Sequence, residues 1–193
     1  VPLFQNISRF VFDNVGNTFS AKKVSDYLKS QKLRISVDTV QKYLGYLTES
    51  YALRQVKRYD LKGKRNLEIH EKYYLGDIGL RNALLGYRES AINGLLENLV
   101  YLELLRRGYQ VSIGKWGEFE IDFIATRERE RQYFQICYLL ASEETMEREC
   151  RVLTALPDNY PKTVMSLDSA NPGIRDGIKW QNIVEFLMED APG

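Results

Sequence analysis

The chain is 193 residues long, 44% hydrophobic and 12% aromatic, which is enough for one good core or two small ones. It has no apolar run long enough to span a membrane and no signal peptide, so we expect a cytoplasmic protein without a membrane partner. With one histidine, His70, and two cysteines, Cys137 and Cys150, a zinc site of His and Cys ligands is excluded.

The formal net charge of +1 conceals an uneven distribution. Residues 1–72 hold 14 Lys and Arg against 7 Asp and Glu, whereas the rest of the chain holds 13 against 19. A basic first part favours a polyanionic partner, although small helical domains are often rich in lysine for other reasons. Because the chain starts at Val1 rather than at Met, we expect another domain to precede it in the full protein.

Apolar residues at helical spacing predict three helices, at Leu3–Val15, Ala21–Ser30 and Val37–Glu49. Ser20 and Ser36 stand just before the second and third of these helices, where a serine side chain caps the free backbone N–H groups. The first part of the chain is therefore expected to be a small helical bundle.

Two strands, Leu53–Tyr59 and Leu67–Leu75, are predicted around the basic turn Asp60–Arg65. Three helices followed by a hairpin are typical of a winged helix, here residues 1–75, in which the third helix enters the major groove and the hairpin touches phosphates. The residues expected to bind DNA are Lys42, Lys57, Arg58, Lys62, Lys64 and Arg65. Winged helices also serve as spacers and protein docking modules, so a protein partner remains an alternative.

Residues 76–193 are predicted to form an α/β domain around a central mixed sheet. After a junction helix between two glycines, the expected elements are a helix at Ala91–Arg107, a strand at Tyr109–Trp116, a hairpin at Glu118–Tyr138, a helix from Ser142 to Leu156, a strand at Lys162–Leu167, a loop at Asp168–Gly177, and a short strand and closing helix at Gly177–Met188. The fold class expected for the whole chain is thus α/β, a winged helix followed by a restriction-endonuclease-like domain.

The hairpin Glu118–Tyr138 consists of two alternating runs, which mark half-buried strands. In its first run the apolar face is expected to hold Phe119, Ile121 and Phe123. Glu120 and Asp122 would share the opposite face, and on the second run Gln135 and Cys137 share a face. Pairing of the two strands would bring an acidic pair near a glutamine and a cysteine.

Two carboxylates of the long helix receive different interpretations. Glu97 shares its face with Val100 in a leucine-rich helix, so it needs a cation, a metal or a hydrogen-bond donor. Glu103 precedes Arg106 and Arg107 by three and four residues, which a plain surface ion pair explains.

A carboxylate from a helix, an Asp on a strand and a (D/E/Q)-x-K on the next strand are the parts of a PD-(D/E)xK nuclease. Acidic oxygens hold Mg²⁺ or Mn²⁺ there, and the lysine steadies the attacking water. The matching residues are Glu97, Asp122 and Gln135, and Glu120 could add a metal ligand. Cys137 stands in the lysine position, where it is expected to be a small buried residue rather than a nucleophile.

The chain resembles the C-terminal region of archaeal and bacterial AAA-type ATPases, which joins a winged helix to a PD-(D/E)xK nuclease-like domain of unassigned function. The resemblance covers essentially the whole chain and is carried by the segments YYLGDIGLRNALLG, GLLENLVYLELLRRGYQV, EIDFIA, YFQICYLLASEETMERE and DNYPKTVMSLD. It implies an ATPase module before Val1. ATP is expected only in that module, because this chain has no GxxxxGK[ST] loop.

Together these features predict a non-catalytic accessory region that binds DNA through the winged helix and keeps a nuclease fold without its lysine. One alternative is a Mg²⁺- or Mn²⁺-dependent nuclease that uses Glu97, Asp122 and Gln135 with a cation from another strand or subunit. Another is a protein-interaction module, which exposed patches among the 13 tyrosines would favour.

Overall fold

The computed structural model describes residues 2–140, 142–169 and 173–189, with residues 68–70 described by their backbone alone. These residues form seven α-helices, one short 3-10 helix and eight strands, which confirms an α/β fold with a mixed sheet. The chain packs as two compact units, residues 1–57 with 68–98 and residues 58–67 with 99–193. We call them the first and second unit. Both are discontinuous in sequence.

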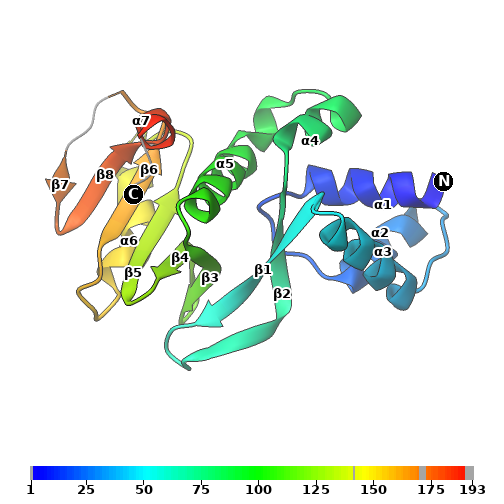
Figure 1. The fold of residues 1–193 in the computed structure, drawn as a ribbon, viewed down its shortest axis with the longest axis horizontal. Helices are drawn as coiled ribbons and strands as arrows, with labels where there is room; N and C mark the ends of the chain where they lie inside the picture. The colour runs from blue at the N-terminus through cyan, green and yellow to red at the C-terminus, as the bar shows by residue number, and fades with distance from the viewer. Residues whose placement is uncertain (1, 141, 170–172, 190–193) are drawn as a thin grey trace. The chain divides into compact units, whose positions relative to one another are not determined.

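The first unit begins with α1 (Pro2–Asp13), α2 (Ala21–Ser30) and α3 (Val37–Glu49), drawn in blue in Figure 1. All three predicted helices are confirmed. Ser20 and Ser36 act as the predicted caps, since each side chain accepts a hydrogen bond from the backbone N–H three residues on. The core between the helices is built from apolar residues that include Ile7, Val11, Val24, Leu28, Val40 and Leu44.

In the rest of the first unit, a buried asparagine of α5 connects this helix to the end of β2. The elements that follow α3 are β1 (Leu53–Asp60), β2 (Arg65–Leu75), α4 (Ile78–Leu85), η1 (Glu89–Ala91) and α5 (Ile92–Arg106). Asn98 of α5 donates to the carbonyl oxygen of Leu75 at 2.9 Å and accepts from its N–H at 2.7 Å. These two hydrogen bonds connect the last residue of β2 to α5. They also satisfy backbone groups that burial would otherwise leave unpaired.

The second unit carries most of the sheet, in the order β2-β1-β3-β4-β5-β6-β8-β7. Its elements are β3 (Gln110–Trp116), β4 (Phe119–Arg127), β5 (Glu130–Ile136), α6 (Glu143–Thr154), β6 (Lys162–Ser166), β7 (Ile174–Arg175), β8 (Ile178–Asn182) and α7 (Ile183–Met188). Strands β3, β4 and β5 are antiparallel neighbours, whereas β5, β6 and β8 run parallel. Figure 1 shows these strands side by side with α6 against them. Strand β7 lies inside the segment expected to be only a loop.

An irregularity in β4 corrects the expected faces of the hairpin. Ser112 pairs with Ile124 and Gly114 with Ile121, so two steps along β3 match three along β4. The extra residue is a β-bulge, which reverses the alternation of side chains beyond it. Ile121 and Phe123 therefore lie on opposite faces, and the prediction of one shared face is wrong.

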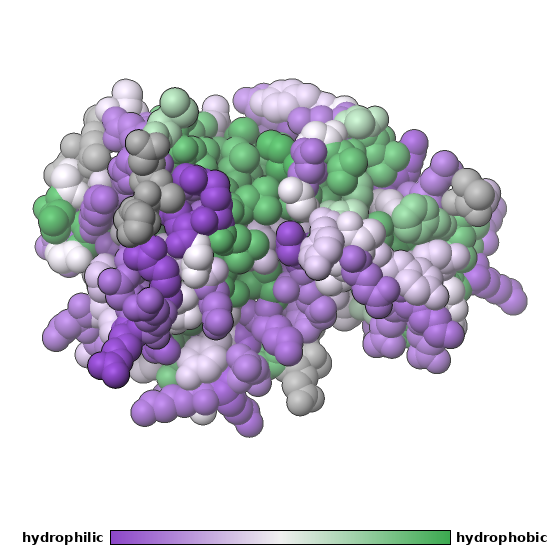
Figure 2. Space-filling model, in the orientation of Figure 1, coloured by the Kyte–Doolittle hydropathy of each residue, from purple (hydrophilic) through white to green (hydrophobic). Residues whose placement is uncertain are grey.

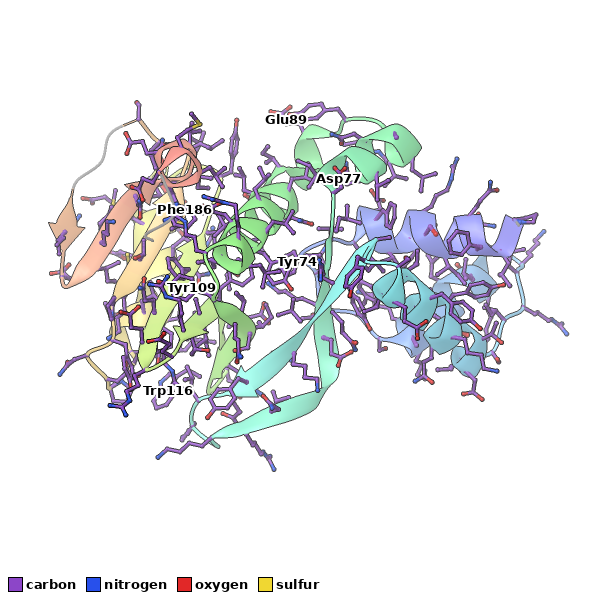
Figure 3. All side chains as sticks on the ribbon, in the orientation of Figure 1. Tyr74, Asp77, Glu89, Tyr109, Trp116 and Phe186 are labelled. Carbon is purple, nitrogen blue, oxygen red and sulfur yellow. The ribbon has the colours of Figure 1, made fainter. Side chains whose placement is uncertain are left out.

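Helices cover both faces of this part of the sheet. On the side of α6, Ile121 belongs to a buried cluster with Tyr133, Cys137, Leu153 and Trp180. On the other side the ring of Phe123 packs 5.9 Å from Tyr101 of α5, and Phe134 lies 6.4 Å from Phe186 of α7. Figure 3 marks Tyr109 just before β3, Trp116 at the end of β3, and Phe186 in α7. Coverage on two sides explains why Asp122 is only 7% exposed.

Glu103 forms the predicted pair with Arg106 and Arg107, but the pair is not a surface one. Its carboxylate is 8% exposed and lies 2.7 Å from Arg106 and 2.6 Å from Arg107. Arg107 also donates to the carbonyl oxygen of Phe186 at 2.5 Å, and its guanidinium lies 4.0 Å from that ring. The end of α5 is thereby bound to α7.

This arrangement predicts a pH dependence of stability. Hydrogen bonds from Arg106, and then Arg107, hold the pKa of Glu103 below its usual value, although burial acts in the opposite direction. A carboxyl whose pKa is lowered by folding stabilises the protein at pH values above its pKa in the unfolded chain, about 4.3. This contribution is lost as the pH falls through its pKa in the folded chain. We therefore expect Glu103→Gln to destabilise the chain at neutral pH and to differ less from the wild type in acid. Urea unfolding across pH, with Glu144→Gln as a control at an exposed site, measures this; a pH-independent difference would refute it.

Candidate functional site

Asp122 lies at the bulge of β4, and its carboxylate is hydrogen-bonded to the backbone of β5. Its Oδ2 accepts a hydrogen bond from the N–H of Ile136 at 2.8 Å, and its own N–H donates to Oε1 of Gln135 at 3.4 Å. The bulge removes regular ladder bonds, and these side-chain oxygens take their place. Asp122 and Gln135 are thus brought together as the hairpin predicted, by contacts that complete the sheet.

Gln135 continues the network to α6. Its Nε2 donates to Glu149 Oε2 at 3.2 Å, while Arg148 donates to the other oxygen of Glu149 at 2.9 and 3.1 Å. The Glu149 side chain is 12% exposed. A carboxylate in this position needs such donors, because burial without them is costly.

Cys137 is buried beside three carboxylates. Its Sγ lies 3.6 Å from the carbonyl oxygen of Met165. Burial, followed by the charges of Glu149, Asp168 and Asp122, raises the pKa of the Cys137 thiol to about 12. The thiol is therefore neutral at physiological pH, and a neutral thiol supplies neither the positive charge of a lysine nor a nucleophile.

We accordingly expect Cys137 to be unreactive in the folded chain. In a Cys150→Ser background a thiol reagent at mildly alkaline pH should label the folded protein very slowly and the urea-unfolded protein at once, as absorbance of the released chromophore reports. The unfolded sample is the control for reagent and thiol. Rapid labelling of the folded Cys150→Ser chain would contradict the buried, protonated thiol.

The other two predicted acidic ligands have their own cationic partners. Glu120 lies 3.4 Å from Nη2 of Arg58, within the second unit. Glu97 belongs to the first unit, where its Oε2 lies 3.2 Å from Nζ of Lys72 and 2.9 Å from the hydroxyl of Tyr74 on β2 (Figure 3). Glu97 was expected to need a cation, a metal or a hydrogen-bond donor, and the structure gives it a cation and a donor, both from β2.

Each carboxylate expected to bind a metal has a hydrogen-bond donor or a basic side chain as a partner within its own unit. Among the described residues no group of three or more His, Cys, Asp and Glu is placed to hold a metal ion. Asp122 Oδ2 accepts a hydrogen bond from a backbone N–H, and Glu120 and Glu97 each lie next to a basic side chain. The assignment of Glu97, Asp122 and Gln135 to catalysis stays a prediction.

Two acidic residues of this site were missed by the sequence reasoning. Glu149 falls three residues after Met146 and four before Leu153, both of which pack toward the sheet, so a carboxylate within the apolar stripe of α6 was an available signal. Asp168 follows β6, and its Oδ2 accepts from the N–H of Leu140 at 2.7 Å. No local pattern indicated Asp168, because its partner follows another strand.

The residues expected to bind DNA are divided between the two units. Lys42 on α3 and Lys57 on β1 are exposed and belong to the first unit. Lys62, Lys64 and Arg65 are exposed at the hairpin turn, which packs with the second unit; Arg58, also there, is half-buried and contacts Glu120. Arg58 is therefore the member of the set least available to a ligand.

A further group of cations, which the sequence reasoning did not assign, lies between α2 and α3. Lys29, Lys32, Arg34 and Ser36 line a surface hollow there. Lys32 has a φ of 62°, a left-handed conformation that usually falls to glycine or asparagine at a helix end. The Lys32 side chain is exposed at this turn.

No helix of the described chain combines the length and the apolar character needed to cross a bilayer.

Residues 1–91 match a family model described as "Domain of unknown function (DUF8612)". The chain is 34% identical to an uncharacterized protein of Haemophilus influenzae over 97% of its length, and 30% identical to an uncharacterized protein of Methanocaldococcus jannaschii over 80%. It spans 46% and 34% of those two relatives, and no solved structure matches it. The chain is thus similar to parts of longer bacterial and archaeal proteins.

Proposed function

We propose that the first unit is a winged helix that binds DNA, and that the second unit is a nuclease-like domain that does not cut it. The chain would then be an accessory region of an AAA-type ATPase. The observation that carries the proposal is the cationic rim at the start of α3, where Lys29, Lys32 and Arg34 line one surface hollow together with the Ser36 cap. Phosphate oxygens are favourable partners for such a rim and for the N–H groups at a helix start.

The exposed side of α3 supports the same assignment. Val40, Leu44 and Leu47 bury the inner side of the helix, which leaves Lys42 and Tyr46 on the outer side. A helix fixed to its bundle on one side and open on the other leaves one face available to DNA. Exposed Lys62, Lys64 and Arg65 at the hairpin turn belong to the second unit and give that unit cations of its own for phosphate contacts.

Three observations support a second unit that does not cut DNA. Cys137 occupies the lysine position and its thiol is neutral, Asp122 is engaged by the backbone of β5, and no metal cluster occurs in the described residues. The order of a helix, three antiparallel strands, a crossover helix and a parallel strand supports the proposed nuclease-like fold. The greater length of both relatives is compatible with a separate ATPase module.

Fluorescence anisotropy of labelled DNA tests the binding half of the proposal. The triple variant Lys29→Gln, Lys32→Gln, Arg34→Gln should bind at least about tenfold more weakly at low salt, with a log–log salt slope shallower by about 2 to 3, since each phosphate contact contributes about 0.9. A control that removes the same charge from exposed sites of the second unit, Arg129→Gln, Arg151→Gln, Lys179→Gln, should retain binding. If the two triple variants lose the same DNA affinity, the rim contributes only non-specific charge.

Incubation of plasmid with the chain and Mn²⁺ tests the other half. We expect no cleavage above a buffer control. Cleavage that disappears in both Asp122→Asn and Asp122→Ala would instead establish the nuclease alternative.

A further inference from the structure

The outer side of the first unit displays a stripe of aromatic rings that its own core does not use. Phe4 of α1 is 39% exposed and Tyr46 of α3 is 59% exposed, with the half-buried Tyr43 between them. The ring centroids of Phe4 and Tyr43 are 5.8 Å apart, and those of Tyr43 and Tyr46 are 6.2 Å apart at right angles. We call these three residues the aromatic stripe. Over α3 the surface in Figure 2 shows pale areas, the shade of residues with intermediate hydropathy such as tyrosine, among purple ones.

The stripe follows the side of α3 that a nucleic acid would meet. Tyr43 and Tyr46 are three residues apart and Lys42 is four before Tyr46, so all three side chains lie on neighbouring parts of one helix face. Lys42 is exposed, and the rim of Lys29, Lys32 and Arg34 lies at the start of the same helix. A run of rings beside cations suits an anionic ligand that also carries flat apolar groups.

The chemistry of this face differs from that of a helix that reads duplex DNA. Base edges in the major groove are read by side chains that present several hydrogen-bond donors and acceptors. Here the central positions hold rings, whose faces stack on nucleobases, and stacking requires a base that is not enclosed in a duplex. Grooves that bind single strands combine such rings with backbone-tracking cations.

The geometry points to a preference of the first unit for single-stranded or locally unpaired DNA, whose bases stack on the aromatic stripe while the cationic rim holds the phosphates. The inference rests on the proposed DNA binding and adds the structure of the DNA to it. A protein partner is the competing occupant of exposed rings, but the first unit holds 12 Lys and Arg against 9 Asp and Glu, and this excess of basic residues favours a polyanion.

Anisotropy titrations of one sequence as a single strand and as a duplex, with wild type, Tyr46→Ala and Tyr46→Phe, test the inference. We expect the wild type to bind the single strand more tightly. Tyr46→Ala should weaken single-strand binding about tenfold, in the range of one lost stacking contact, with little effect on the duplex. Tyr46→Phe keeps the ring and should bind like the wild type.

Each contrary result has a distinct meaning. If neither DNA form binds, the proposed function fails and the inference with it. If both forms bind but Tyr46→Ala is without effect, or weakens both equally, DNA binding stands and the stripe has no role in selecting unpaired bases. A change in oligomeric state in sedimentation, with single-strand affinity retained in Tyr46→Ala, would assign the stripe to protein association instead. Because Tyr46 is exposed, the far-ultraviolet circular dichroism of the variants should match the wild type.

Discussion

Replacing Lys72 by methionine is expected to destabilise the first unit by about 3 to 5 kcal/mol, the usual cost of removing one partner of a buried ion pair. Lys72 is only 4% exposed, and its Nζ lies 3.2 Å from Glu97 Oε2, whose side chain is 13% exposed. Methionine fills a similar volume but leaves the Glu97 carboxylate without this cation in a poorly solvated position.

The double variant Lys72→Met, Glu97→Gln should recover most of that loss, because a neutral amide next to a thioether leaves no buried charge and still accepts from the Tyr74 hydroxyl. Urea unfolding followed by far-ultraviolet circular dichroism is the appropriate measurement, since both tryptophans, Trp116 and Trp180, belong to the second unit. A Lys72→Met variant within about 0.5 kcal/mol of the wild type would show that the pair contributes nothing measurable.

Replacing Asp122 by alanine is expected to cost about 1 to 3 kcal/mol, the penalty for a buried donor that loses a charged acceptor. The N–H of Ile136 would lose its bond to Oδ2, and the bulge would lose the residue that closes it. Asp122→Asn keeps one acceptor oxygen and should cost less. Trp180, in the buried cluster on the side of α6, reports the unfolding of this unit by fluorescence.

Glu118→Ala provides the matched control, because Glu118 is an exposed carboxylate just before β4 and should be replaceable at little cost. If Asp122→Ala is as stable as Glu118→Ala, the carboxylate is not a structural part of the sheet. That outcome would instead favour a catalytic role for Asp122.

The elements that the sequence predicted well are those specified by local signals. Ser20 and Ser36 mark helix starts by their own side chains, and the apolar spacing after them defines which side of α2 and α3 is buried. The bulge in β4 depends instead on how β3 pairs with it. Period-two alternation placed Ile121 and Phe123 together, and only the pairing with Ser112 and Gly114 reveals the extra residue between them.

The candidate site divides along the same line. A carboxylate in an apolar helical stripe requires a partner, so the need of Glu97 for a cation, a metal or a donor was predictable. That the partner is Lys72 was not predictable, because Lys72 is on β2. The contact between Asp122 and Gln135 followed from hairpin geometry. The contact of Gln135 with Glu149 depends on the crossover helix α6, whose placement no local pattern fixes.

The salt dependence of DNA binding tests the central claim most directly. Anisotropy of labelled DNA titrated with the chain at a series of salt concentrations should give submillimolar affinity at low salt and a log–log slope of about −3 or steeper, as expected for three or more neutralised phosphates. Affinity weaker than about millimolar at low salt, or a slope near zero, would contradict a DNA-binding first unit.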